Sequence, residues 1–455
     1  SATVPAWAAS GEPTCSPALT LKPTATGYDD KAGAYTEWLV PEGVGRVRFD
    51  LVGGAGGAAT SFTPRYLTDV TNASLAGGGA GAQLSGVLAV KSGDILRVWA
   101  GNGGVGSASG ANPALGGEGY AAGGDSTGSS NATGSAQVVG SDSGYVYGAS
   151  GGGSSAVELV RDGSVTVVAV AGAGGGGAQL GTLTTHQRIF DTQPKDQLNP
   201  ALRIAMEHSD ANSTAGGSAG GDLGTDNTGQ GGMLMASPYQ EFKPLDEDDK
   251  TLDMRFMVTG GTAGRSGVAG ALGEAMIGIL DENNELKLMP MSTSWFESYD
   301  FPRYYLYGGD SVHEGEKGTG GANATGSYRG KGGSGALLSR TQGKLSLASV
   351  ASGGGAGYGG GGAGLNIWTV GSYYEGVFGR QVQFENEGNI YSLSALSSGG
   401  GAGGSYINHE VVSDFALATA QNANPTAGVR SPGSAALYSC TENATLNTPI
   451  TEGAL

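Results

Sequence analysis

Four short apolar runs in this chain each end at a cluster of glycines. The runs have the length of β-strands, and the first of them alternates strictly between apolar and polar residues. They are Val47–Val52, Val165–Ala171, Leu345–Ser352 and Tyr391–Ser398. The clusters that follow them are Gly53–Gly57, Gly172–Gly177, Gly353–Gly362 and Gly399–Gly404. Because glycine loses more conformational freedom on folding than any other residue, the repeated arrangement predicts that backbones pack closely where the strands end.

The same pattern predicts two hairpins in the first hundred residues. Strands over 35–40 and 47–52 flank the turn Pro41–Gly43, and strands over 84–90 and 95–100 flank the turn Lys91–Asp94. We therefore expect each pair to lie side by side in one sheet.

Later strands are expected at 156–160, 164–171 and 252–258. Residues 278–280 and 286–289 flank Asp281–Asn284, which predicts a hairpin. Only Pro200–His208 has a helical spacing, and it predicts one short helix. The fold class expected is all-β, a β-sandwich.

Composition divides the chain into four parts. Residues 1–34 are rich in Ala, Thr and Pro and are expected to be an N-terminal arm or tail. Residues 35–181 are the first part of a glycine-rich β domain, and 182–310 are a less glycine-rich insertion. Residues 311–455 are the second part of the domain and a C-terminal tail.

Glycine and proline are so abundant that disorder is the first alternative to a packed fold. The chain has 88 Gly and 16 Pro in 455 residues, yet charged residues make up only 14% and hydrophobic residues 38%. No strict Gly-X-Y period occurs, which excludes collagen. Flexible Gly/Ser linkers remain an alternative for the clusters themselves, although the regular strand before each cluster favours packing.

The net charge of −17 argues against a nucleic-acid partner, because phosphate binding depends on basic patches. No run of 18 or more apolar residues occurs, so no transmembrane segment is expected. The chain begins Ser1-Ala-Thr-Val-Pro, which fits a mature N-terminus after removal of a signal peptide, although a trimmed chain would begin in the same way. These features predict a secreted protein.

Two cysteines, Cys15 and Cys440, lie near opposite ends of the chain. Their spacing does not resemble a metal or redox motif, but it suits a disulfide in an oxidising compartment. Three states stay open at this point: a bond within the chain, a bond between Cys15 of one subunit and Cys440 of the next, and two free thiols.

Five Asn-x-Ser/Thr sequons are consistent with a glycosylated exterior. They begin at Asn72, Asn131, Asn212, Asn323 and Asn443.

Catalytic and cofactor motifs are weak, so neither enzyme activity nor a cofactor or metal is expected. Gly172–Gly177 matches GxGxxG after a strand, but no amphipathic helix follows as a dinucleotide fold requires. The four histidines lack a paired metal spacing. The acidic run Asp246–Asp249 lacks the spaced ligands of a calcium loop and is expected to be a solvated charged loop.

An aromatic segment at 295–307 is the candidate for recognition of a surface glycan or receptor. Large aromatic side chains near glycines can form a stacking surface, although burial in the core of the insertion is the alternative. The candidate residues are Trp295, Tyr304, Tyr305 and Tyr307.

Several strings resemble the glycine-rich domain of bacterial surface proteins and the extracellular glycine-rich region of anaplastic lymphoma kinase receptors. They include Trp38–Val44 with the strand after it, Val90–Leu96, and the clusters at 172–177, 353–364 and 399–404. The resemblance covers about 35–181 and 308–407. It implies a jelly-roll-like sandwich whose glycine runs pack as polyglycine II helices, with single small side chains at Ala55, Ala173, Ala356 and Ala402. Glycine-rich tip adhesins of T-even-like phages are similar in composition only.

Two functions follow as hypotheses. The first is a structural subunit of a cell-surface filament, sheath or layer, in which copies of the chain pair through strand edges or the terminal arm. The second is a bacterial or phage adhesin that binds a surface glycan or receptor.

Overall fold

A computed structural model describes most of the glycine-rich regions and the strands that they join. The described residues are 12–59, 77–106, 113–126, 135–138, 144–177, 235–236, 240–242, 252–258, 260–265, 267–280, 286–290, 304–308, 321, 324, 329–335, 337–342, 345–372, 383–386 and 389–452. Within them every regular element is a β-strand, so the all-β expectation is confirmed at this level. The segment 200–208, expected to be a helix, lies outside the described residues, as does the acidic run 246–249.

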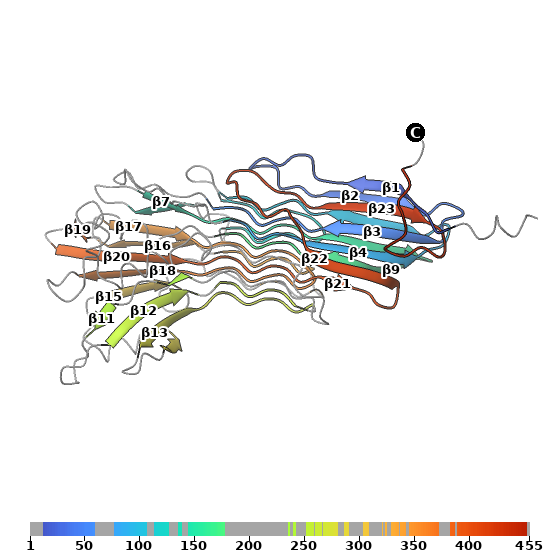
Figure 1. Cartoon of the computed structure of the whole chain (residues 1–455). Helices are drawn as coiled ribbons and strands as arrows, with labels where there is room; N and C mark the ends of the chain where they lie inside the picture. Colours follow the sequence, from blue (N-terminus) through green and yellow to red (C-terminus); the bar gives the residue numbers. More distant parts are fainter. Residues whose placement is uncertain are drawn as a thin grey trace, which may run out of the picture.

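Ten strands form two five-stranded antiparallel sheets at one end of the molecule (Figure 1). The first sheet has the order β1(Cys15–Leu21), β23(Ser434–Cys440), β3(Arg46–Val52), β4(Ala82–Ala89) and β22(Val412–Thr419). The second has the order β2(Ala34–Leu39), β5(Ile95–Ala100), β8(Ser155–Arg161), β9(Ser164–Ala171) and β21(Tyr406–Ile407). Residues 15–21, in the segment expected to be an arm, thus belong to a sheet.

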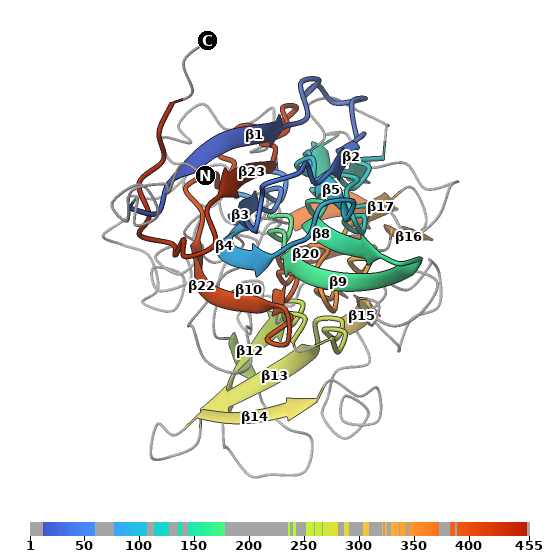
Figure 2. The same ribbon diagram turned by 90° about the vertical axis from the view of Figure 1, so that its right-hand side faces the viewer.

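The two sheets pack face to face as a β-sandwich, seen end-on in Figure 2. Buried and partly exposed residues alternate along β3, as a strand with one face on a core requires. One apolar cluster joins Val47, Phe49 and Leu51 of the first sheet to Leu96 and Val98 of the second. The ring of Phe49 lies where a side chain at Gly86 would be, which explains a glycine inside β4.

The prediction of two hairpins in the first hundred residues is wrong. The turn at 40–45 carries the chain from β2 in the second sheet to β3 in the first, and the turn at 90–94 carries it from β4 back to β5. The apolar pattern of these strands was interpreted correctly, but each pair buries its apolar faces against one another instead of sharing hydrogen bonds.

Shorter sheets lie at the opposite end of the molecule (Figure 1). The hairpin expected around 281–284 is confirmed, because β13(Ala275–Leu280) pairs with β14(Leu286–Pro290). The remaining strands of this end are β6(Ser135–Val138), β7(Gly144–Tyr147), β10(Met235–Ala236), β11(Gln240–Phe242), β12(Leu252–Val258), β15(Tyr304–Gly308), β16(Leu337–Gln342), β17(Leu345–Val350), β18(Asn366–Ser372), β19(Gln383–Asn386) and β20(Asn389–Ser397).

Glycine-rich segments run side by side between the two ends as long wavy traces (Figure 1). They are neither helix nor strand, and we call them together the glycine bundle. Its segments are 53–59, 77–81, 101–106, 113–118, 121–126, 148–154, 172–177, 260–265, 268–274, 329–335, 351–357, 360–365 and 398–404. The chain passes through the bundle repeatedly, which brings residues hundreds of positions apart into contact.

Hydrogen bonds in the bundle repeat every three residues. The N–H groups of Gly174 and Gly177 donate to the carbonyls of Gly54 and Gly57 in one neighbouring segment. The N–H groups of Ala173 and Gly176 donate to a second segment, at Ala356 and Gly353. A period of three is that of an extended left-handed helix, which makes no hydrogen bonds within itself and must find partners in its neighbours.

The close spacing leaves no room for side chains at most glycines. A Cβ on Gly56 would collide with the carbonyl oxygen of Gly175, and one on Gly174 would collide with that of Gly79. The four alanines that the resemblance places inside the clusters are wholly buried. These are Ala55, Ala173, Ala356 and Ala402.

Buried serines occupy the places where the bundle meets a sheet. The hydroxyl of Ser155 donates to the carbonyl of Val52 and accepts from the N–H of Gly101. Ser405 accepts from the N–H of Gly172 where β21 begins. Backbone groups lose a hydrogen-bond partner where a strand changes into a glycine segment. A serine hydroxyl can take the place of that partner.

Candidate functional site

The pole of the sandwich that carries the disulfide joins both ends of the described chain. Cys15 and Cys440 form a disulfide within the chain, across a sequence separation of 425 residues. They are direct partners in the register of β1 and β23, so the bond links two adjacent strands. Of the three states left open by the sequence, the structure shows the bond within the chain.

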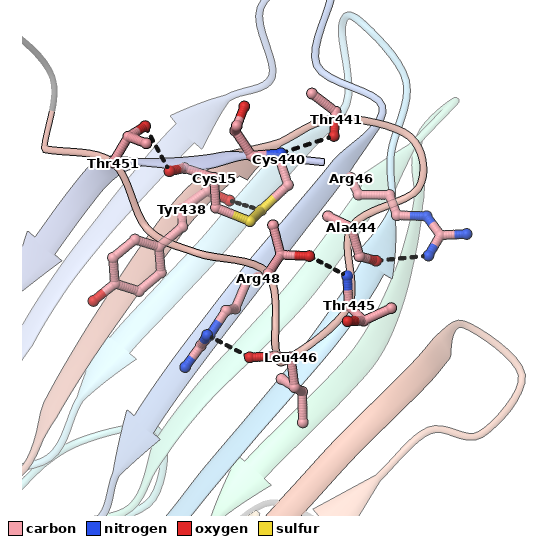
Figure 3. Close-up of a disulfide and its surroundings, with 12 residues drawn as sticks. Cys15, Arg46, Arg48, Tyr438, Cys440, Thr441, Ala444, Thr445, Leu446 and Thr451 are labelled. Carbon is pink, nitrogen blue, oxygen red and sulfur yellow. Dashed lines mark hydrogen bonds between the residues drawn. A yellow bond between two sulfur atoms is a disulfide. The ribbon is translucent and has the colours of Figure 1, made fainter. Parts of the chain in front are cut away.

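The residues after β23 lie across the outer face of the first sheet (Figure 3). Arg46 Nη1 donates to the carbonyl of Ala444 at 2.9 Å, and Arg48 Nη1 donates to that of Leu446 at 2.8 Å. The N–H of Leu446 in turn donates to Asp414 Oδ2 of β22 at 2.9 Å. Residues 441–452, which we call the tail, are therefore held on this face by three charged side chains.

The tail then reaches the outer edge of β1. The N–H of Cys15 donates to the carbonyl of Pro449, and the N–H of Thr451 donates to the carbonyl of Cys15. Cys15 and Ile450 form a parallel bridge. The start of this edge strand is thus covered by the chain itself, which is one way in which proteins prevent edge-to-edge pairing.

A buried arginine fastens the loop before β2 to the glycine bundle. Arg430 is only 2% exposed, and its guanidinium donates to carbonyls instead of a carboxylate. Nε donates to Gly27, Nη2 to Tyr28, and Nη1 to both Gly103 and Leu115. Burial lowers the pKa of Arg430 to about 10, so the group remains charged at neutral pH and attracts the carbonyl oxygens around it.

The outer face of the second sheet differs from that of the first, because it displays three rows of side chains. The row nearest the glycine bundle follows the register Tyr35, Trp99, Ala156, Val170, Tyr406. The middle row contains Glu37, Arg97 and Glu158. The third row contains Leu39, Ile95, Val160 and Val165.

Five aromatic side chains gather along the first row, and we call them the aromatic strip. The ring centroids of Tyr35 and Trp99 are 4.9 Å apart, and those of Trp99 and Tyr120 are also 4.9 Å apart. Tyr358 and Tyr406 stack at 4.0 Å with an interplanar angle of 22°. Tyr35 is half exposed and the other four are partly exposed.

Charged groups lie along the strip. Arg329 Cζ is 5.0 Å from the centroid of the Tyr120 ring, which is within the range of a cation–π contact. Arg97 Nε lies 3.3 Å from Glu37 Oε1, close enough for an ion pair although the geometry is not that of a hydrogen bond. Tyr35 donates its hydroxyl to Glu37 Oε1 at 2.9 Å.

The strip keeps its tyrosine hydroxyls protonated. Burial, with the nearby Glu158 carboxylate and despite Arg329, raises the pKa of Tyr120 to about 12. Burial and the Glu37 carboxylate likewise raise the pKa of Tyr35, and burial beside Tyr358 raises that of Tyr406. All three hydroxyls are therefore protonated at neutral pH, and those of Tyr35 and Tyr120 are bonded to the carboxylates of Glu37 and Glu158.

The sequence did not single out the aromatic strip. Tyr35 and Trp99 occupy alternate, outward positions of their strands, and Tyr120 and Tyr358 lie in turns between glycine segments. An isolated tyrosine within glycine-rich sequence was the available signal, but the strands that bring these residues together are far apart in the chain.

The other residues singled out from the sequence are only partly described. Tyr304, Tyr305 and Tyr307 lie on β15, opposite Gly371, Val370 and Trp368 of β18, while Trp295 lies outside the described residues. Of the sequons, Asn443 is exposed at the start of the tail. The sequons at Asn72, Asn131, Asn212 and Asn323 lie outside the described residues.

Gly172–Gly177, the GxGxxG match, is an internal segment of the glycine bundle. The N–H groups of Ala173, Gly174, Gly176 and Gly177 all donate to carbonyls of neighbouring segments, so they do not form a phosphate cradle. His409 packs its ring against Phe415 at 5.2 Å.

Neither a membrane-spanning helix nor a metal site is found among the described residues. No helix there is long and apolar enough to span a membrane. No group of three or more His, Cys, Asp or Glu side chains in the same residues is placed to hold a metal ion.

The chain matches no protein-family model, and comparison with curated proteins gives no significant relative.

Proposed function

We propose that this chain is an extracellular, non-enzymatic adhesin in which a rigid glycine bundle joins a disulfide-bonded sandwich to a second group of sheets. The disulfide supports an oxidising, extracellular environment. The pole with the disulfide unites the two ends of the described chain, while the shorter sheets lie at the other pole (Figure 1).

The glycine bundle acts as the spacer in this proposal. Its hydrogen bonds repeat every three residues, as expected for polyglycine II helices, and a Cβ at most positions would collide with a neighbouring backbone. At about 3.1 Å per residue, a six-residue segment such as Gly172–Gly177 would span roughly 19 Å. Each segment is hydrogen-bonded to several others, so the bundle resists bending. A single glycine linker would be flexible instead.

The resemblance noted in the sequence agrees with this interpretation. Glycine-rich domains of bacterial surface proteins combine a jelly-roll-like sandwich with polyglycine II helices. A two-sheet sandwich and a bundle with a period of three support this resemblance. We therefore assign the chain to this architecture as part of the proposal.

The closure of the disulfide pole is the observation that favours an adhesin over a polymer subunit. Cys15 and Cys440 are bonded to each other, and the tail occupies the edge of β1 at Cys15. A terminal arm and an intermolecular disulfide were two routes by which copies could have been linked. The disulfide, and residues 15–21 of the arm, are already used within one chain.

A filament or layer subunit is the second candidate, because other edges remain. β2 and β22 end their sheets with no further strand beside them among the described residues. Tyr35 and Leu39 on β2 are 50% and 63% exposed. An edge of this kind could accept a strand from a second copy.

Molar mass as a function of concentration separates the two candidates. Light scattering after size exclusion should show a monomer of 45.0 kDa over a wide concentration range without reductant. Concentration-dependent growth, or fibres in negative-stain electron microscopy, would overturn the adhesin in favour of the filament subunit.

Binding to cells or surface glycans is the positive test of the adhesin. The monomer should bind, and the variant with Tyr304, Tyr305 and Tyr307 changed to Ala tests whether β15 contributes. A monomer that binds neither cells nor glycans would contradict the proposed function.

A further inference from the structure

The aromatic strip combines the two kinds of surface that a sugar ring requires. A pyranose has an apolar C–H face, which packs on aromatic rings, and a rim of hydroxyls, which needs hydrogen-bond donors and acceptors. Tyr35, Trp99 and Tyr406 supply partly exposed rings in one row of the second sheet, and Tyr120 and Tyr358, in turns of the glycine bundle, pack against Trp99 and Tyr406. Aromatic side chains with a polar end are well suited to a surface of this kind, apolar in one part and wet in another.

Polar groups lie beside the rings at a useful spacing. Glu37 and Arg97 lie two residues from Tyr35 and Trp99 on the same face of β2 and β5, about 7 Å away along the strand. Their side chains are 50% and 36% exposed, so both remain accessible although they pair with each other. Arg329 adds a second guanidinium over Tyr120.

The charges favour a neutral sugar over an acidic one. Within the strip and the row beside it, Glu37 and Glu158 balance Arg97 and Arg329. The whole chain carries a net charge of −17, which repels polyanions at long range. A sulfated or uronic-acid polymer would therefore meet no local excess of positive charge.

The strip has its rings in two groups toward the ends of the row, because Ala156 and Val170 between them are fully buried. Its row crosses five strands from Tyr35 to Tyr406, and at about 4.8 Å between neighbouring strands it extends over roughly 19 Å. The two outer faces of the sandwich also differ in access. The tail lies over the first sheet, whereas the rings of Tyr35 and Trp99 on the second sheet are partly exposed.

We propose that the aromatic strip on the outer face of the second sheet binds neutral hexopyranose chains, with the rings of Tyr35 and Trp99 as the stacking platform. This site rests on the proposed adhesin function and gives it a ligand class. It lies in the sandwich, so it is separate from the β15 tyrosines at the other end of the molecule.

Binding of the full chain to immobilised cellohexaose, maltohexaose and mannan tests the site, with heparin as the anionic comparator. Isothermal titration of the best probe then compares three variants. Tyr35→Ala should weaken binding by about tenfold because a stacking ring is lost, whereas Tyr35→Phe should keep most of the affinity. Glu37→Gln should weaken it by about threefold, because a charged acceptor for sugar hydroxyls becomes a neutral amide.

Leu39→Ala is the matched control. Leu39 lies on the same strand and the same face as Tyr35, two positions beyond Glu37, and is also well exposed. Its substitution removes apolar surface outside the strip and should change affinity less than twofold. Thermal unfolding of each variant shows whether a loss of binding comes from a loss of fold.

Each result has a defined meaning. If the wild-type chain binds a neutral oligosaccharide and only the strip variants lose it, the site is supported. If Tyr35→Ala behaves like Leu39→Ala, or heparin binds best, the inference is overturned while an adhesin function stands. If the chain binds cells but none of the neutral probes, the inference also fails alone. If it binds neither, both the site and the proposed function fail.

Discussion

The sandwich and the glycine bundle solve the same packing problem in opposite ways. In the sandwich, side chains such as Phe49, Leu51 and Leu84 fill the space between two sheets. In the bundle the side chains are absent, and backbones approach until carbonyl oxygens occupy the positions of the missing Cβ atoms. Substitutions that remove side-chain atoms should therefore destabilise the sandwich, and substitutions that add side-chain atoms should destabilise the bundle.

The two regions also differ in how they satisfy the backbone. Sandwich strands exchange hydrogen bonds with two neighbours, as in any sheet. The segment at 172–177 bonds to five other described segments, which are 53–59, 77–82, 148–154, 351–357 and 398–404. A defect in the bundle should therefore spread in several directions, whereas a defect in the sandwich should remain within one sheet or the core.

Removal of the disulfide is the largest change that should act on one region only. The double variant Cys15→Ser/Cys440→Ser should lower the free energy of unfolding by about 5 kcal/mol in the chain-entropy model, since the bond closes nearly the whole chain. Hydrogen exchange measured by mass spectrometry should rise in β1, β23 and the tail. An equal rise in the hydrogen-exchange rate of 172–177 would show that the disulfide stabilises the bundle as much as the sandwich.

Truncation of Phe49 tests the side-chain core. Phe49→Ala removes a fully buried ring and should lower the free energy of unfolding by about 4 kcal/mol, measured in urea. Val165→Ala, at a half-exposed position of the second sheet, is the control and should change it by less than about 0.5 kcal/mol. A small effect of Phe49→Ala would mean that the sandwich core can collapse around the cavity.

Two adjacent glycines test the bundle with one methyl group. A Cβ at Gly78 would collide with the carbonyl oxygen of Gly56, whereas at Gly77 the nearest atom is the carbonyl oxygen of Asn424 at 3.7 Å. Gly78→Ala should lower the free energy of unfolding by about 3 kcal/mol through overpacking. Gly77→Ala should be nearly neutral in the same urea titration. Similar losses in both variants would indicate that glycine is needed for a reason other than space.

A partly buried ion pair gives the sandwich a pH dependence. Asp94 accepts from Arg161 at 2.7 and 3.0 Å and from the N–H of Lys91. Burial opposes ionisation of this carboxyl, but Arg161 and Lys91 outweigh it and hold the pKa of Asp94 below its usual value. The stabilisation is therefore present above the ordinary pKa and is lost as the pH falls through the lower pKa of the folded state.

Asp94→Asn should accordingly lower the free energy of unfolding by about 2 kcal/mol at pH 7. The gap between variant and wild type should narrow as the pH falls below the ordinary carboxyl range. Lys31→Gln, which breaks an exposed pair with Glu118, is the control and should have no measurable effect at either pH. A gap that stays constant with pH would contradict the role of the Asp94 charge.

Local pattern was sufficient for the strands and insufficient for their partners. Alternation along 47–52 and 95–100 identified β3 and β5, because a strand with one buried face shows a period of two. The same pattern could not tell a hairpin from a crossover between sheets, since both bury the same residues. The hairpin of β13 and β14 was predicted correctly because these two consecutive strands pair with each other in one sheet.

The candidate site was harder to predict for the same reason. Trp99 was visible as part of a strand and Tyr120 as an isolated aromatic, but their contact depends on a glycine segment returning to the sandwich. Tyr358 and Tyr406 lie in different glycine-rich regions and meet only through the bundle. The sequence instead predicted a recognition surface at 295–307, because seven aromatic residues are close together there.

The sequence by itself determined the all-β character, the positions of six of the ten sandwich strands (β2, β3, β4, β5, β8 and β9), and the need for close backbone packing after each apolar run. These depend on periodicity and on glycine, which are local properties of the chain. Only the tertiary structure decided which sheet each strand joins, that Cys15 meets Cys440, and that five distant aromatic residues share one face. Glycine segments have no side chains to specify their neighbours, so their partners are selected by the hydrogen bonds and the space of the whole assembly.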